Sequence, residues 1–293
     1  MEQPSGILHR GRCPKTPIAD FPEEAARRNV CILTDIDDTL TTDGQLSAAS
    51  YAALERLHAA GLAVVPVTGR PAGWCDMIAR FWPVAGVIGE NGAFYFRHDP
   101  VARKMVRKFV ASEAERATNR RRLAALGERI LAEVPGAAIA ADQLYREADL
   151  AIDFCEDVPP LPHAAINKIV SLFENEGGVA KVSSIHVNGW FGAYDKLSMT
   201  RIFLRDGLRL DLDAAKDRIL FCGDSPNDAP MFGFFPHACG VANVNDFIGE
   251  LTAYPSYIAS KRGGEGFIEI ADKILSARAG LPAPARESQS WHL

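Results

Sequence analysis

The chain has 293 residues, of which 47% are hydrophobic and 24% charged, so it can bury one large core or two smaller ones. Its formal net charge of −5, without a basic block or stripe, argues against nucleic acid as a partner. No apolar run approaches the roughly 18 residues that suggest a membrane span, and residues 1–21 lack the apolar centre of a signal peptide. We therefore expect a cytoplasmic protein with no membrane partner.

The cysteines are scattered along the chain without a C-x-x-C pair, at Cys13, Cys31, Cys75, Cys155, Cys222 and Cys239. Cys31 and Cys222 lie inside apolar stretches that have the pattern of strands. This distribution favours buried free thiols over disulfides or a zinc site. A metal site built from oxygen ligands is still possible.

The predicted elements begin after an irregular N-terminal tail. Residues 1–29 mix four prolines with charged side chains and show no sustained period. From residue 30, short apolar runs at 30–36, 62–67 and 84–89 alternate with helical patterns at 47–60 and 71–81. Short buried strands that alternate with helices predict an α/β fold with a doubly wound parallel sheet, covered by helices on both faces.

The alternation is interrupted after Asn91-Gly92. Sheet-like runs at 94–96 and 104–110, a long charged helix at 113–134, and further helix and strand patterns up to residue 190 predict a second, mixed α/β unit. A helix from Asp195 and a buried strand at 218–222 then resume the first pattern, which continues to residue 277. We therefore predict a core of residues 30–91 and 195–278, an inserted domain at 92–194, and a loose C-terminal tail at 279–293.

Two acidic motifs follow predicted strands. They are Asp35-Ile36-Asp37-Asp38-Thr39 and Gly223-Asp224-Ser225-Pro226-Asn227-Asp228. Ligands collect at the carboxyl ends of strands in open α/β sheets, and clustered carboxylates need a cation, for which hard oxygen ligands favour Mg²⁺. Either motif alone is also compatible with a capped turn. Their occurrence together, about 190 residues apart, favours one shared acidic site.

Two further motifs offer groups that suit an anion. Thr68-Gly69-Arg70 lies between a strand and a helix, where a hydroxyl, backbone N–H groups and the helix N-terminus can meet an anion. Lys196 stands where the core pattern resumes and can direct its ammonium group at a phosphate. Taken singly, these residues are equally compatible with a plain helix cap and a solvated lysine.

In this order, the four motifs resemble the haloacid dehalogenase superfamily of phosphatases and phosphotransferases, and the resemblance spans residues 30–278. Glu90-Asn91-Gly92-Ala93 resembles the boundary that precedes the larger, C2-type cap of some members. The length and α/β pattern of the insertion are similar to the Cof-like, sugar-phosphate phosphatase branch, subfamily IIB. The resemblance implies a Rossmann-like core with an inserted α/β cap domain.

The resemblance also implies roles for individual residues. Asp35 would be the nucleophile that forms an aspartyl-phosphate, and Asp37 the general acid and base. Magnesium would be bound by Asp35, Asp224 and Asp37, the last through its backbone carbonyl, with Asp228 as a neighbouring partner. The transferring phosphate would be held by Thr68, Gly69, Lys196 and Asn227.

The expected function is magnesium-dependent hydrolysis of a small phosphorylated metabolite, a sugar phosphate or a phosphorylated sugar acid, by a monomer or small homo-oligomer. The segment from Ser183 to Lys196 loosely resembles mannosyl-3-phosphoglycerate phosphatases, so His186 is either a substrate contact or a structural strand residue. Arg70 is either a contact to a second substrate anion or a salt-bridge partner. A phosphomutase on the same core is an alternative. A non-catalytic binding protein is a weaker one, because the four motifs are intact.

Overall fold

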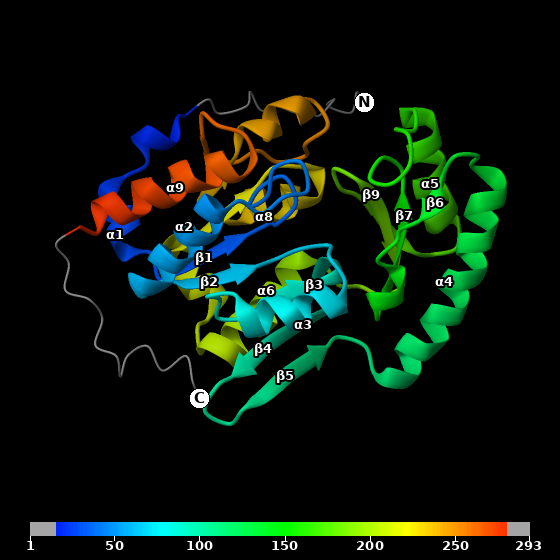
Figure 1. The fold of residues 1–293 in the computed structure, drawn as a ribbon, viewed down its shortest axis with the longest axis horizontal. Coiled ribbons are helices and arrows are strands. Elements are labelled where there is room, and N and C mark those ends of the chain that lie inside the picture. The colour runs from blue at the N-terminus through cyan, green and yellow to red at the C-terminus, as the bar shows by residue number, and fades with distance from the viewer. Residues whose placement is uncertain (1–15, 280–293) are drawn as a thin grey trace, which may run out of the picture.

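The structure, a computed structural model, describes residues 16–279. Its centre is a five-stranded parallel sheet in the order β12-β11-β10-β1-β2 (Figure 1). The strands are β1 (Cys31–Thr34), β2 (Ala63–Pro66), β10 (Ile219–Gly223), β11 (His237–Gly240) and β12 (Tyr257–Ile258). A parallel bridge from Val67 to Ile88 links β2 to β3 (Val87–Gly89).

Helices cover both faces of this sheet, because the apolar side chains of β1 point alternately to one face and to the other. Ile32 packs among residues of α1 (Glu23–Arg28), α2 (Ala48–Ala59), α3 (Ala72–Phe81) and α9 (Gly263–Ala277). Cys31 and Leu33 face the other way and pack with α6 (Lys196–Leu208), α7 (Leu212–Ala215) and α8 (Ala229–Phe234). Successive strand residues point to opposite faces, so one apolar strand supplies both layers of the core. The predicted doubly wound α/β fold is confirmed.

Short 3₁₀ helices join these elements: η1 (Ile18–Asp20), η2 (Glu90–Gly92), η3 (Gln143–Tyr145), η4 (Lys216–Arg218), η5 (Pro226–Asp228) and η6 (Ala242–Phe247). Local chemistry sets the ends of the longer helices. Ser47, for example, caps α2 by accepting the Ser50 N–H through its hydroxyl at 3.0 Å. Gly61 follows the helix at φ 79°, a conformation that other residues rarely adopt, and turns the chain into β2.

The prediction of an irregular N-terminal tail is wrong for its second half. Residues 16–28 contain η1 and α1, and Ile18, Phe21, Ala25 and Ala26 are buried in the core. Helix α1 has six residues, too few for a helical period to emerge from a stretch rich in proline and charge. It is held instead by packing on α9, which lies about 240 positions further along the chain. The remainder of that tail, residues 1–15, lies outside the described residues.

The elements of the predicted inserted domain fall into two groups. The hairpin of β4 (Phe94–Asp99) and β5 (Lys104–Phe109) pairs antiparallel with β3, and Phe94 and Phe96 are buried in the core beside α3. The second group runs from α4 (Glu113–Glu133) to β9 (His186–Trp190), and we call it the cap. That residues 92–194 act as one domain stays a prediction.

The cap is a four-stranded antiparallel sheet in the order β6-β7-β9-β8 with two helices on one face. Its elements are α4 (Glu113–Glu133), β6 (Ala138–Ile139), β7 (Asp149–Asp153), α5 (His163–Asn175), β8 (Val179–Val182) and β9 (His186–Trp190). Leu150, Ile152 and Val187 face the helices. Because strand residues alternate, the intervening polar residues lie on the opposite face of the sheet, toward the core.

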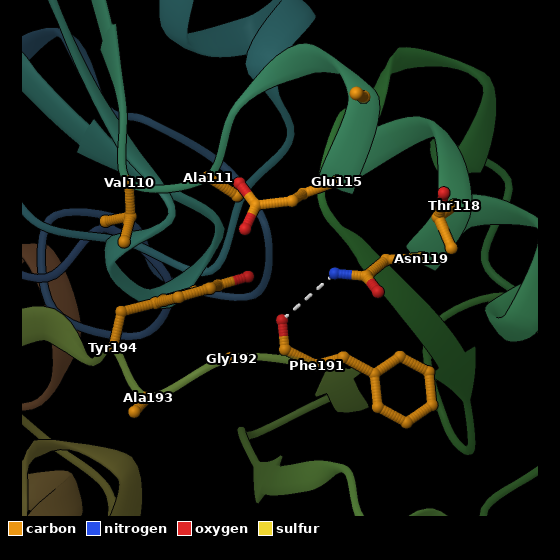
Figure 2. A pocket seen from close by; sticks show the side chains of 10 residues that line it. Val110, Ala111, Glu115, Thr118, Asn119, Phe191, Gly192, Ala193 and Tyr194 are labelled. Carbon is orange, nitrogen blue, oxygen red and sulfur yellow. Dashed lines mark hydrogen bonds between the residues drawn. The ribbon is translucent and has the colours of Figure 1, made fainter.

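Two chain segments connect the cap to the core, at residues 110–112 and 191–195, and a groove of about 720 Å³ lies between them. Figure 2 shows Val110 and Ala111 of the first connection opposite Gly192, Ala193 and Tyr194 of the second. The Asn119 side-chain amide donates to the Phe191 carbonyl at 3.3 Å and ties α4 to the second connection. Two short adjacent connections are the arrangement that lets a domain rock against its neighbour.

Gly92 lies where the core chain passes the second connection, and alanine there is expected to destabilise the fold. Its φ is +104°, and an added Cβ would come within 2.0 Å of the Asp195 carbonyl oxygen. Strain and overpacking together should cost about 3 kcal/mol or more, read out as a lower midpoint in urea. Gly177→Ala is the matched control, because Gly177 also has a positive φ but no atom within 4 Å of the added Cβ. Equal losses in the two variants would contradict the close contact.

The cysteines of the described residues are free thiols, and four of them, Cys31, Cys75, Cys222 and Cys239, are buried. This agrees with the predicted absence of a disulfide framework; Cys13 lies outside the described residues. Among residues 16–279, no helix combines the length and apolarity that crossing a bilayer requires.

Candidate active site

Acidic side chains meet at the carboxyl edge of the core sheet. Strands β1 and β10 are parallel neighbours in which Thr34 is paired with Cys222, so Asp35 and Asp224 emerge at the same edge. One carboxylate oxygen from each of Asp35, Asp224 and Asp228 lies within 4.8 Å of the others. All three side chains are buried. The two acidic sequence motifs therefore form one cluster.

Lys196 is the cation closest to this cluster. Its Nζ lies 3.1 Å from Asp35 Oδ2 and 2.7 Å from Asp228 Oδ1. The residue is the first of α6, whose N-cap is Asp195 with a reciprocal capping box to Ser198. The helix start thus holds the lysine side chain buried between two motifs that are far apart in the sequence.

The net charge of the cluster shows whether a metal ion would fit there. Three buried carboxylates face one ammonium group, which leaves two negative charges when all are ionised. Burial raises the pKa of Asp35 to about 7, with Lys196 lowering it and Asp228 raising it. The pKa of Asp224 is also raised, by burial and then by Asp228 and Asp35. A divalent cation would supply the missing positive charge, so the donor set fits a hard ion such as Mg²⁺.

Asp228 has the contacts of a positioning residue. One oxygen accepts from Lys196, and the other accepts the Asp224 backbone N–H at 3.0 Å. A Cβ on Gly223 would lie 2.3 Å from Asp228 Oδ2, so only glycine fits at that position. Asp224 also accepts from the Thr39 hydroxyl at 3.3 Å. These contacts direct the Asp224 carboxylate toward Asp35.

Asp37 and Arg70 form an ion pair at the rim of the cluster. Arg70 Nε donates to both Asp37 carboxylate oxygens, at 2.9 and 3.0 Å. The same guanidinium lies 3.5 Å from Asp142 and 2.9 Å from Glu156, and its carbon is 4.5 Å from the centre of the Trp74 ring. The sequence left two roles open for Arg70, a contact to a second substrate anion or a salt bridge. The structure shows the salt bridge.

The other predicted phosphate contacts lie around the same edge. The Thr68 hydroxyl accepts the Arg70 backbone N–H at 3.0 Å. Gly69 lines the cavity above the cluster, and its carbonyl accepts from Arg146 at 2.9 Å. Asn227 also lines the cavity, and its side-chain oxygen accepts from the Ser225 hydroxyl at 3.0 Å. Gly69 and Asn227 thus face the carboxylates, while the Thr68 hydroxyl is engaged within its own loop.

The cap closes this cavity. The turn between β8 and β9 contributes Ser183, Ser184 and Ile185 to the wall. His186 lines the cavity as the first residue of β9. A water molecule's centre can occupy only about 10 Å³ there, which is room for about one water. The described arrangement is therefore a closed one, without room for a sugar-sized molecule.

The sequence analysis missed three polar residues of the cap: Arg146 and Asn188, which line this cavity, and Glu156, which pairs with the lining residues Arg70 and His186. Asn188 donates to Asp149 at 3.0 Å, and Glu156 contacts both Arg70 and His186. A signal for Glu156 was present, since Asp153 to Asp157 is another acidic stretch at the end of a buried strand. Arg146 lies in a short irregular segment, for which the pattern contains no comparable signal.

A doubly wound core with buried carboxylates at its edge and an α/β cap agrees with the fold that the resemblance to the haloacid dehalogenase superfamily implies. The family model described as haloacid dehalogenase-like hydrolase matches residues 32–116, which agrees with the predicted resemblance. No curated protein sequence matches the chain significantly.

Solved structures share the fold over most of the chain. A Thermoplasma acidophilum protein is 21% identical with a TM-score of 0.64, covering 84% of this chain and 98% of its own. The C-terminal domain of trehalose-6-phosphate phosphatase from Candida albicans is 12% identical with a TM-score of 0.68, at 91% and 99% coverage. Sucrose-phosphatase from Synechocystis, in complex with sucrose and phosphate, is 16% identical with a TM-score of 0.57, at 86% and 97% coverage. At these identities the likeness establishes the fold.

Proposed function

We propose that this protein is a magnesium-dependent phosphomonoester hydrolase that acts on a small phosphorylated metabolite, a sugar phosphate or a phosphorylated sugar acid. The observation that carries the proposal is the position of Asp35, buried at the sheet edge between Lys196 and Asp224 with Asp37 at the rim. Two proteins of the same fold are phosphatases of trehalose 6-phosphate and sucrose phosphate, which supports the substrate class.

The first half-reaction assigned to these residues is phosphoryl transfer to Asp35. A carboxylate oxygen of Asp35 attacks phosphorus, the bond from phosphorus to the ester oxygen breaks, and Asp37 donates a proton to the departing alcohol. Lys196 keeps the Asp35 carboxylate in place through its contact at 3.1 Å and adds positive charge beside the transferring group. Mg²⁺ held by Asp35, Asp224 and the Asp37 carbonyl would offset the charge repulsion between carboxylate and phosphate.

The second half-reaction is hydrolysis of the aspartyl-phosphate. Asp37, deprotonated after the first step, takes a proton from a water molecule whose oxygen attacks phosphorus. The bond between phosphorus and the Asp35 oxygen then breaks, which releases inorganic phosphate and restores the carboxylate. Arg70 holds the Asp37 side chain at the rim, where it can serve both steps. The closed cap excludes bulk water during transfer.

The direct test is release of inorganic phosphate from a panel of phosphorylated metabolites and from p-nitrophenyl phosphate, with the full chain and Mg²⁺. Phosphate release with turnover supports the proposal. No release from any member, with Mg²⁺ present and the protein folded, would contradict it.

Removal of divalent metal is expected to lower this activity at least about 100-fold, because the carboxylates then repel the phosphate. Dialysis against EDTA followed by addition of Mg²⁺ should restore it. A second readout is thermal unfolding: Mg²⁺ at 100 times its Kd should stabilise the folded protein by about 2.7 kcal/mol. Asp224→Asn should weaken this stabilisation. Full activity in EDTA, or equal stabilisation of wild type and variant, would argue against the metal site.

A further inference from the structure

Every arginine that lines the cavity among the described residues is already neutralised. Arg70 pairs with Asp37, Asp142 and Glu156 at 2.9 to 3.5 Å. Arg146 donates to both oxygens of Asp142, at 2.9 and 3.0 Å, and to both oxygens of Asp149, at 3.0 and 3.1 Å.

The balance of charge around these two arginines is negative. Two guanidinium groups face four carboxylates: Asp37, Asp142, Asp149 and Glu156. Lys196 adds no positive charge to this balance, because its ammonium group is paired with Asp35 and Asp228. A proton on His186 would still leave the carboxylates in excess. A second anionic group on a substrate would therefore meet uncompensated negative charge at close range.

Glu156 and His186 form a polar pair on the cap. Glu156 Oε2 lies 2.9 Å from His186 Nε2. The close approach of His186, followed by the hydrogen bond from Arg70, lowers the pKa of Glu156 to about 2, so its carboxylate is ionised. Its side chain is 31% exposed, whereas that of Arg70 is 5% exposed. Glu156 is thus the more accessible partner and a strong acceptor for hydroxyl groups.

The backbone holds this pair in a set geometry. Asp153 accepts the backbone N–H groups of Cys155, Glu156 and Asp157 at 2.8 to 2.9 Å, which shapes the loop that carries Glu156. The Ser183 hydroxyl accepts the His186 backbone N–H at 3.0 Å and fixes the turn before β9. Side chains on such supported segments are pre-organised for recognition. The neighbouring wall residues Ser183, Ser184 and Asn188 are uncharged and can donate or accept hydrogen bonds.

We infer that the substrate carries one phosphate on an otherwise neutral, hydroxylated molecule, and that Glu156 and His186 recognise its hydroxyl groups. The inference rests on the proposed function and narrows it. It selects the neutral sugar or polyol phosphates over the phosphorylated sugar acids, and it disfavours bisphosphates, which a phosphomutase would need to bind.

The test compares matched pairs of substrates with the full chain and Mg²⁺. Glucose 6-phosphate is set against 6-phosphogluconate, glycerol 3-phosphate against 3-phosphoglycerate, and fructose 6-phosphate against fructose 1,6-bisphosphate. In each pair we expect kcat/KM to be at least about tenfold higher for the member without the second anion, since an unpaired charge next to carboxylates costs at least about 1.4 kcal/mol. Equal or higher kcat/KM for the more anionic members would overturn the inference.

Glu156→Gln tests the residue assignment. It removes one negative charge and keeps the size of the side chain, so kcat/KM should fall about tenfold for the preferred neutral substrate and less for its anionic partner. The ratio of kcat/KM between the neutral and the anionic member of a pair should therefore become smaller. Glu174→Gln, at an exposed glutamate of α5, is the control and should leave that ratio unchanged. A ratio that Glu156→Gln does not alter would overturn the assignment.

The reference substrate p-nitrophenyl phosphate separates two kinds of failure. If it and all the metabolites release no phosphate, the proposed function fails, and the inference fails with it. If it is hydrolysed but the anionic members are preferred, the proposed function stands and only the inference about substrate charge is wrong.

Discussion

Replacing Asp35 with asparagine is expected to lower phosphate release by about 10⁴-fold or more, because it removes the nucleophile on which both half-reactions depend. The amide has almost the same shape as the carboxylate, so the fold should be retained. Burial raises the pKa of Asp35 to about 7, from 3.8 in the unfolded chain. The ionised group therefore costs stability as pH rises through this range, and the metal-free variant should melt at a higher temperature than wild type above neutral pH.

Three measurements decide this prediction: phosphate release with Mg²⁺, thermal unfolding without metal, and trapping of a phosphorylated chain by rapid acid quench. Asp217→Asn, at an exposed residue of η4, is the control and should keep full activity. If Asp35→Asn retained a tenth of the wild-type rate, this residue would not be the covalent nucleophile.

Asp37→Asn is expected to reduce turnover by about 10² to 10⁴, because the amide can neither donate the proton to the alcohol nor accept one from water. Arg70 keeps Asp142 and Glu156 as partners, so the rim should stay assembled. In the transfer step, the loss should be larger for an alkyl phosphate than for p-nitrophenyl phosphate, since nitrophenolate departs without a proton.

Single-turnover formation of the phosphorylated chain isolates that transfer step, and the comparison should use both kinds of ester. Equal losses for good and poor leaving groups would show that Asp37 is not the acid. A normal rate of phosphoenzyme breakdown would show that it is not the base.

The strand and helix pattern of the core was accessible from the sequence because each element carries its own signal. Apolar runs ending in acids marked β1 and β10, and both acidic motifs do lie at strand ends. The pairing of these two strands was not accessible. It joins residues about 190 positions apart, and only this pairing brings the two acidic motifs together as one carboxylate cluster.

Elements whose stability comes from distant partners were predicted less well. Helix α1 is too short to carry a period and is held by α9. The hairpin of β4 and β5 has a recognisable strand pattern, but its pattern alone does not say which sheet it joins; pairing with β3 places it on the core.

Arg70 shows most clearly what the sequence by itself determined and what tertiary structure decided. The motif Thr68-Gly69-Arg70 placed a guanidinium next to an anion-binding loop, and no local pattern could tell whether that charge was free. Its partners Asp37, Asp142 and Glu156 come from the core and from two separate segments of the cap. Sequence alone thus determined which chemical groups stand at the strand ends. Which charges are cancelled depends on distances between segments that only the packed chain brings together, because Coulomb interactions act through space.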